Sequence, residues 1–170
     1  FISNRIVEKD LITKVYEMSS IDLNKTQDIR YGNGKCSPNM KLLENESLII
    51  KSVSKDLIKI MEEAVNSEIY VIESFFNILK AGSGTTPHRH LDPFDKATKL
   101  GKQKYSLVYY LDVGDQNCNE PGTLKIYDPD EEILPTNGSI VIIPSDRKHS
   151  AIYGGKIDRV MIGINFYSLF

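Results

Sequence analysis

The spacing of hydrophobic residues changes about a third of the way along the chain, and the first third favours helices. Over residues 6–18 the apolar positions recur at helical spacing. A second apolar stripe ends near residue 65, and Ser54 before it is a suitable N-cap, since its hydroxyl can accept a hydrogen bond from a backbone N–H. Residues 24–38 are polar and rich in glycine, which predicts a loop or an edge strand. We therefore expect a helical N-terminal support over about residues 1–67.

After residue 67 the pattern changes to short segments rich in β-branched and aromatic residues, separated by Gly, Pro, Asn and Asp. They predict strands over 68–80, 105–111, 122–127, 139–143, 150–153 and 159–167. Strands at this spacing favour a sandwich or barrel, with a jelly roll as the natural closure. Because the helices precede the strands, we expect a mainly β fold with the helices packed on the outer face of one sheet. The chain length predicts one domain, 1–170, with its β core at about 68–168.

Composition and charge narrow the functional classes. The net charge is −2 at pH 7 with no stripe of Lys or Arg, so neither nucleic acid nor an anionic membrane surface is indicated as a partner. No apolar run has the length of a membrane span, and no export signal opens the chain. Cys36 and Cys118 lack a CxxC spacing, so we expect free thiols in a reducing, cytoplasmic compartment. Because the first residue is Phe1 rather than Met, we expect that an upstream segment was trimmed or processed.

Histidine positions carry the candidate chemistry, because the chain has only three histidines and they fall in two places. His90 and Asp92 form an H-x-D motif, and in an extended segment residues i and i+2 point to the same side. His149 follows the apolar segment predicted as a strand over 139–143. Two imidazoles and one carboxylate are the ligands of many non-haem Fe(II) oxygenases, so His90, Asp92 and His149 are the candidate metal ligands. For His88 we favour a hydrogen-bonded structural role, with a role beside the metal or facing the substrate as the alternative.

Arg159 begins the last predicted strand, and the two faces of that strand differ. Alternation places Met161, Gly163 and Asn165 on the face of Arg159, whereas the other face is continuously apolar. The mixed face has the composition of a pocket wall, in which Gly163 leaves room for a ligand. A guanidinium pairs bidentately with a carboxylate, so Arg159 is the candidate carboxylate-binding residue. Tyr110 can add its hydroxyl to the same carboxylate; the alternative is an aromatic side chain of the core.

Four blocks of the chain resemble the prolyl 4-hydroxylase-like branch of the Fe(II)/2-oxoglutarate-dependent dioxygenases. The resemblance covers roughly residues 76–166. Its blocks are 82–92 (GSGTTPHRHLD), 106–112 (SLVYYLD), 122–129 (GTLKIYDP) and 143–149 (IPSDRKH) followed by Arg159. No single block is specific, but all four occur in the order of the branch. The chain departs from the branch at Lys80, where a Tyr is common, and at Ser106, where a Thr is common.

The resemblance implies a double-stranded β-helix in which His90, Asp92 and His149 bind Fe(II). It also implies that Arg159 and Tyr110 hold the distal carboxylate of 2-oxoglutarate. O2 would be the second co-substrate, ascorbate would help to maintain activity, and hydroxylation of an unactivated C–H would release succinate and CO2. The implied substrate is a prolyl or other peptidyl residue, with a free amino acid or small metabolite as the alternative. The sequence does not set an oligomeric state.

Two other readings use the same residues differently. Cupins share the β-helix, and in that reading His88, His90 and His149 are the main metal ligands while Asp95 replaces the cupin glutamate. It leaves Arg159 without a role. The third reading is a non-catalytic β-sandwich binding module, for which replacement of the histidines would change neither metal content nor function.

Residues 91–104 are polar and rich in lysine, and they begin at the candidate metal motif. A segment in this position predicts either a lid that closes over the site or a solvated surface loop.

Overall fold

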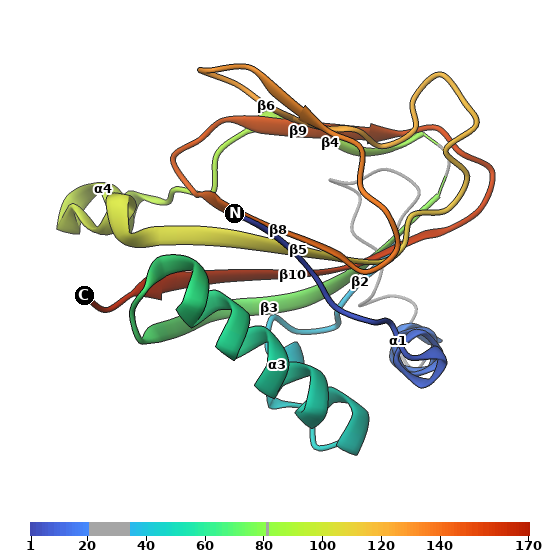
Figure 1. Ribbon diagram of the computed structural model, residues 1–170, viewed down its shortest axis with the longest axis horizontal. Helices are drawn as coiled ribbons and strands as arrows, with labels where there is room; N and C mark the ends of the chain where they lie inside the picture. The colour runs from blue at the N-terminus through green and yellow to red at the C-terminus, as the bar shows by residue number, and fades with distance from the viewer. Residues whose placement is uncertain (21–34, 81) are drawn as a thin grey trace.

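The computed structural model describes residues 1–20, 35–80 and 82–170, and two antiparallel β-sheets face each other in it (Figure 1). The larger sheet has six strands in the order β1-β8-β5-β10-β3-β2, and the smaller has four in the order β4-β9-β6-β7. The strands are β1 (Ile2–Asn4), β2 (Lys35–Cys36), β3 (Ile69–Leu79), β4 (Ser83–His88), β5 (Lys104–Asp112), β6 (Leu124–Ile126), β7 (Glu131–Ile133), β8 (Ser139–Pro144), β9 (His149–Tyr153) and β10 (Arg159–Ser168). From β3 onward the chain passes repeatedly between the sheets, which is the winding of a double-stranded β-helix and confirms the predicted fold class.

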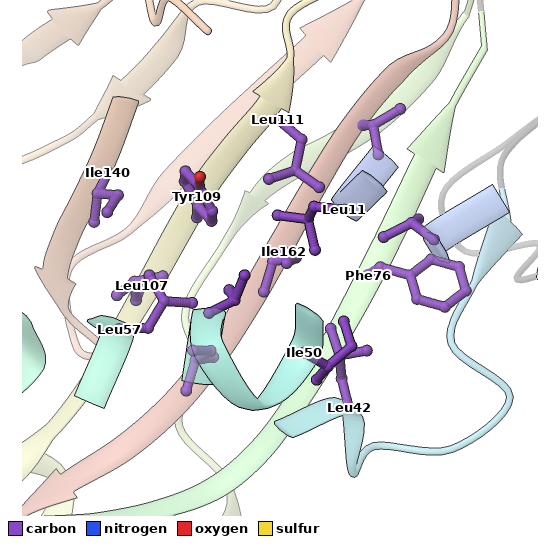
Figure 2. Packing of buried hydrophobic residues seen from close by; sticks show 14 of the residues in the cluster. Leu11, Leu42, Ile50, Leu57, Phe76, Leu107, Tyr109, Leu111, Ile140 and Ile162 are labelled. Carbon is purple, nitrogen blue, oxygen red and sulfur yellow. The ribbon is translucent and has the colours of Figure 1, made fainter. Parts of the chain in front are cut away.

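The helices α1 (Lys9–Ser20) and α3 (Leu48–Val65) cover the face of the larger sheet that points away from the smaller one (Figure 1). Their buried stripes include Leu11 of α1 with Ile50 and Leu57 of α3, and these side chains pack against strand residues such as Leu107 and Ile162 (Figure 2). Full burial of one such side chain stabilises the fold by about 1.5–3 kcal/mol. The expected placement of the helices is therefore confirmed. Among the described residues, no helix is long and apolar enough to cross a membrane.

The start of α3 differs from the prediction. The helix begins at Leu48, and its N-cap is Ser47, whose Oγ accepts a hydrogen bond from the Ile50 N–H at 3.4 Å. Ser54 lies inside the helix, because buried Ile50 and Val53 extend the apolar stripe upstream of it. Of the segment predicted as a loop or edge strand, residues 24–34 lie outside the described part of the chain. The two residues of β2 form an edge strand beside β3.

The alternation predicted for the last strand is present in β10. Val160, Ile162 and Phe166 lie in the core beneath the helices. Met161 and Asn165 line a cavity between the two sheets. Neighbouring β5 alternates in the same way, so its residues Ser106, Val108 and Tyr110 also line the cavity. The fold thus places one mixed face of two central strands opposite the smaller sheet.

Residues 91–104 form short helical segments rather than an open loop. The helix α4 (Pro93–Thr98) is followed by the 3-10 helix η3 (Leu100–Gln103). Another 3-10 helix, η2 (Leu42–Glu44), precedes α3 in the chain. Asp92 caps α4 and Pro93 occupies its first turn, where a missing N–H costs nothing. Lys104, at the end of the segment, is buried rather than solvated. Closure of this segment over the site stays a prediction.

Candidate metal centre

Three histidines meet at one edge of the smaller sheet. His88 ends β4, His149 begins the neighbouring β9, and the two are cross-strand partners. His90 follows β4 and places its Nε2 atom 3.1 Å from that of His88 and 3.0 Å from that of His149. Potential ligand atoms of all three residues lie within 4.8 Å of one another. Within the described residues this is the single such group of His, Cys, Asp and Glu.

Backbone contacts orient two of the imidazoles. The Nδ1 atom of His88 lies 2.8 Å from the Thr86 carbonyl oxygen, and that of His149 lies 3.1 Å from the Arg147 carbonyl oxygen. A carbonyl only accepts, so both Nδ1 atoms are assigned the proton, which leaves lone pairs on both Nε2 atoms. One proton on His90 Nε2 can satisfy one of these lone pairs at a time, whereas a cation can satisfy all three nitrogens. The donor set therefore fits a metal that accepts imidazole ligands.

The surroundings keep two of the three imidazoles, His90 and His149, uncharged. Burial, then the neighbouring His149 and His88, and then Lys104 lower the pKa of His90 to about 3. Burial lowers the pKa of His149 to about 4, against the opposing hydrogen bond to the Arg147 backbone. Both imidazoles are thus uncharged at neutral pH, which is the form that coordinates a metal.

Asp92, expected to share the face of His90, is not brought into this group. Its side chain caps α4, where Oδ1 accepts a hydrogen bond from the Asp95 N–H at 2.9 Å. Its Oδ2 lies 3.6 Å from Lys104 Nζ. The i, i+2 argument holds only along an extended strand, and β4 has already ended at His88. His88, for which we favoured a structural role, is instead the third member of the group.

A buried ion pair adjoins the centre. Lys104 Nζ lies 2.7 Å from Asp95 Oδ2, and both side chains are almost completely buried. The Tyr167 hydroxyl donates a hydrogen bond to the other Asp95 oxygen. Both Asp95 oxygens are therefore engaged by Lys104 and Tyr167. The cupin interpretation required Asp95 to join the histidines, and it does not.

A cavity of about 90 Å³ lies between the sheets, and all three histidines contribute to its lining. Most of its other lining residues are apolar, which favours the exclusion of water. Two polar side chains on its larger-sheet wall are connected, because Ser106 Oγ donates to Asn165 Oδ1 at 2.8 Å. Asn77 also lines the cavity, and its buried Oδ1 has no hydrogen-bond partner. The site is thus an apolar chamber with three clustered imidazoles and a few fixed polar contacts.

Arg159 is buried with only 2% of its surface exposed, and its guanidinium lies between aromatic rings. Its Cζ atom is 5.0 Å from the ring centroid of Tyr110 and 5.5 Å from that of Tyr153. Nη1 donates to the Pro121 carbonyl at 3.0 Å, whereas buried Nη2 has no partner. No carboxylate in the described part of the chain forms an ion pair with it. A buried cation with a free donor is costly unless an anion joins it, so the arrangement fits the carboxylate role expected for Arg159.

Gly163 does not have the role that the alternation suggested. A Cβ atom at this position would lie 2.4 Å from the Phe75 ring, so the space above the glycine belongs to Phe75. Phe75 itself lines the cavity. The glycine therefore makes room for a protein side chain, and Phe75 forms the wall there.

The sequence contains local patterns that indicate the observed roles of His88, Asp92 and Asp95, although the prediction preferred other patterns. The spacing His88-x-His90 is as compatible with metal binding as His90-x-Asp92. Asp92 followed by Pro93, with Asp95 at the third helical position, is the signature of a capping box. Phe75 and Asn77 had no local signal, because their role depends on which strands face each other.

Comparison with known proteins identifies the family to which the chain belongs. The model of a family described as the 2OG-Fe(II) oxygenase superfamily matches residues 76–167, which is more than half of the chain. The matched region runs from β3 to β10 and includes the three histidines and Arg159. Among curated proteins, none matches the chain.

Solved structures with the same fold include two prolyl hydroxylases. A Pseudomonas putida prolyl-4-hydroxylase superposes with a TM-score of 0.68 at 15% identity, covering 100% of this chain and 92% of that chain. A prolyl hydroxylase in complex with a hypoxia inducible factor peptide fragment, from Trichoplax adhaerens, gives 0.64 at 16% identity, covering 99% and 83%. HygX from Streptomyces hygroscopicus, with nickel, 2-oxoglutarate and hygromycin B bound, gives 0.70 at 11% identity, covering 100% and 83%. At these identities the likeness is one of fold.

Proposed function

Because this chain belongs to the 2OG-Fe(II) oxygenase superfamily, we propose that it is an oxygenase whose iron is held by His88, His90 and His149. One observation carries this assignment: three Nε2 atoms converge at 3.0–3.1 Å contacts, and two of them are fixed as lone-pair donors by the backbone. Imidazole is a suitable ligand for Fe(II). The ligand set first expected, with Asp92 in place of His88, is the rival assignment.

A centre of three neutral imidazoles differs electrically from one with a carboxylate. The protein ligands contribute no negative charge, so the full charge of Fe(II) acts on an incoming anion. 2-Oxoglutarate carries two carboxylates, and its attraction to the centre is stronger in an apolar chamber than in water. The three protein nitrogens leave coordination positions for this co-substrate and for O2.

Arg159 and Tyr110 are proposed to hold the distal carboxylate of 2-oxoglutarate. The support is that Arg159 is buried, has a free Nη2 donor and lies against the Tyr110 ring, while Tyr110 lines the cavity with the histidines. A charge-assisted, bidentate bond to the guanidinium orients the co-substrate as well as binding it. The apolar lining, with Val108 and Ile143 among its residues, excludes water from the reaction.

The bound iron, 2-oxoglutarate and O2 supply the oxidising chemistry, which hydroxylates an unactivated C–H and releases succinate and CO2. The residues of the chain provide binding, orientation and exclusion of water. Ascorbate in the assay keeps the iron reduced.

For the substrate we propose a prolyl or other peptidyl residue, and a small molecule is the second candidate. The shared fold of the two prolyl hydroxylases supports the first, and that of HygX with hygromycin B supports the second. A panel of proline-containing peptides and a panel of free amino acids and metabolites separate them. A mass increase of one oxygen, matched by succinate release, on peptides alone supports the first; the same result on small molecules alone contradicts it.

The oxygenase assignment is tested without knowledge of the substrate by anaerobic titration of 2-oxoglutarate into the Fe(II)-loaded protein. We expect a saturable metal-to-ligand charge-transfer band in the visible range, weakened in Arg159→Met. Tightly bound iron without such a band contradicts a 2-oxoglutarate site and favours the cupin reading. Failure to bind iron contradicts the metal assignment altogether.

A further inference from the structure

Asp92 stays out of the metal centre although it lies two residues after His90. The cap that it provides to α4 does not by itself explain this, because its side chain is 54% exposed and an N-cap contributes only about 1 kcal/mol. A cap of this strength does not hold a carboxylate against a divalent cation next to it, so retention of Asp92 in the cap once a metal is bound requires a stronger element between His90 and α4.

That element is the buried pair formed by Lys104 and Asp95. Lys104 Nζ donates to Asp95 Oδ2 at 2.7 Å, and the two residues are only 6% and 1% exposed. The second Asp95 oxygen accepts from the Tyr167 hydroxyl, so both oxygens are committed. Such a pair is hard to disrupt, since removing one partner strands a buried charge, at a cost of about 3–5 kcal/mol. It joins α4 to the first residue of β5 and to β10.

Asp95 transmits this constraint to Asp92 through a reciprocal capping box. The Asp92 N–H donates to Asp95 Oδ2 at 2.9 Å, and the Asp95 N–H donates to Asp92 Oδ1 at the same distance. Lys104 also attracts Asp92 Oδ2 from 3.6 Å. Backbone and carboxylate of Asp92 are thus both tied to the buried pair.

We infer that Lys104 and Asp95 are positioning residues that retain Asp92 in the cap of α4 and so hold the metal ligands at His88, His90 and His149. The inference rests on the proposed metal centre and deepens it. Without the pair, Asp92 is free to compete with His88 for the metal, and the neutral ligand set becomes a mixed one. The pair thereby determines the charge of the centre without touching the metal.

The test uses Co(II) as the probe, because its visible spectrum reports ligand type and its affinity can be measured by competition with a chelator. In the native background we expect Asp92→Asn to leave the Co(II) spectrum and Kd unchanged. The double substitution Lys104→Met/Asp95→Leu removes both buried charges together, which avoids a stranded ion. In that background we expect an altered Co(II) spectrum, and adding Asp92→Asn should reverse it and raise Kd about tenfold.

A matched control is the exposed ion pair of Lys59 and Glu63 on α3, in which Lys59 Nζ lies 3.9 Å from Glu63 Oε1. Its double substitution, Lys59→Met/Glu63→Leu, should leave the Co(II) spectrum independent of Asp92. Should the buried double variant fail to fold, the milder double substitution Lys104→Gln/Asp95→Asn also removes both charges while keeping polar side chains of similar size, and it should show the same dependence on Asp92.

The inference is overturned if Asp92→Asn weakens Co(II) binding in the native background, or if Asp92 has no effect after the pair is removed. In either case the 2-oxoglutarate band of the Fe(II) protein would persist, so the oxygenase assignment would stand. Loss of Co(II) binding and of that band in the unmodified protein would instead overturn the proposed function, and with it the ligand set on which the inference depends.

Discussion

Gly122 lies directly against Arg159: a Cβ atom on the glycine would fall 1.3 Å from the guanidinium Nη1. Gly122 also has a φ of +81°, a conformation that side chains with a Cβ rarely adopt. The backbone just before β6 therefore forms a cradle for the guanidinium, and the Pro121 carbonyl accepts a hydrogen bond from Nη1 in the same cradle. The Arg159 guanidinium can occupy this position only because residue 122 has no side-chain methyl group.

The substitution Gly122→Ala is expected to displace the guanidinium and weaken 2-oxoglutarate binding about tenfold or more, which corresponds to about 1.4 kcal/mol. Metal binding should be unaffected, because the histidines lie on other elements. Gly82→Ala is the matched control, since Gly82 has a similar φ of +78° but no atom within 4 Å of the added Cβ. Anaerobic titrations of both Fe(II)-loaded variants give the two Kd values. An equal loss of affinity in the two variants would mean that backbone strain, and not the cradle, causes it, and an unchanged affinity in Gly122→Ala would contradict the cradle.

Replacement of Arg159 separates charge from geometry. Arg159→Met should raise the Kd of 2-oxoglutarate about 30-fold, because a hydrogen-bonded charge contributes about 2 kcal/mol. Arg159→Lys should recover only part of this loss, since an ammonium lacks the planar fork. Tyr110→Phe should have a smaller effect than Arg159→Met. Titration calorimetry with the anaerobic Fe(II) protein measures all three, and unchanged affinity in Arg159→Met would contradict the assignment.

The elements that the sequence predicted best are those with strong periodicity. One face of β10 lies beneath the helices and the other lines a cavity. Its residue types therefore alternate with a period of two, which could be seen in the sequence. The start of α3 was placed too late because Ser54 is a good cap by composition, while Ser47 is the residue that precedes the buried stripe. Residue type alone does not distinguish these two serines.

The metal centre was only partly predictable for a different reason. The family resemblance of the four sequence blocks predicted that His90 and His149 lie together. The choice between His88 and Asp92, however, depends on where β4 ends. The competing interaction is local, since Asp92 and Asp95 cap α4, and it is reinforced by Lys104 from the next strand. Phe75 occupies the space that Gly163 seemed to offer a ligand, because β3 is the neighbour of β10 in the sheet. Such pairings are set by tertiary structure.

Acid stability tests the buried pair separately from metal binding. Burial by itself raises the pKa of Asp95, but hydrogen bonds from Lys104, Tyr167 and the Asp92 backbone outweigh it and hold the pKa below its ordinary value. A carboxyl with a depressed folded-state pKa contributes stability that is complete above its unfolded pKa of about 3.9 and is lost as the pH falls through the folded value.

Asp95→Asn should therefore lower the free energy of unfolding at pH 7 by about 3 kcal/mol, since it leaves a buried ammonium without its closest partner. The difference from the native protein should shrink as the pH falls below about 4. Urea unfolding of the metal-free proteins at several pH values measures it. A difference that stays constant down to acid pH would mean that the pair is not ionised in the folded protein.

The core of the helical layer gives a prediction that is independent of the site. Leu57 of α3 is fully buried against the larger sheet (Figure 2). Leu57→Ala should destabilise the fold by about 2–5 kcal/mol through lost burial and a cavity. The affinity for 2-oxoglutarate should be retained in the folded fraction, because α3 lies on the far side of the sheet from the cavity. Loss of affinity without loss of stability would contradict this division of the molecule.

The most direct test of the metal centre is the iron content of four single variants after anaerobic equilibrium dialysis against Fe(II). We predict that His88→Ala, His90→Ala and His149→Ala each lose bound iron, while Asp92→Asn keeps the content of the native protein. Iron retained by His88→Ala and lost from Asp92→Asn would contradict the three-histidine centre and restore His90, Asp92 and His149 as its ligands.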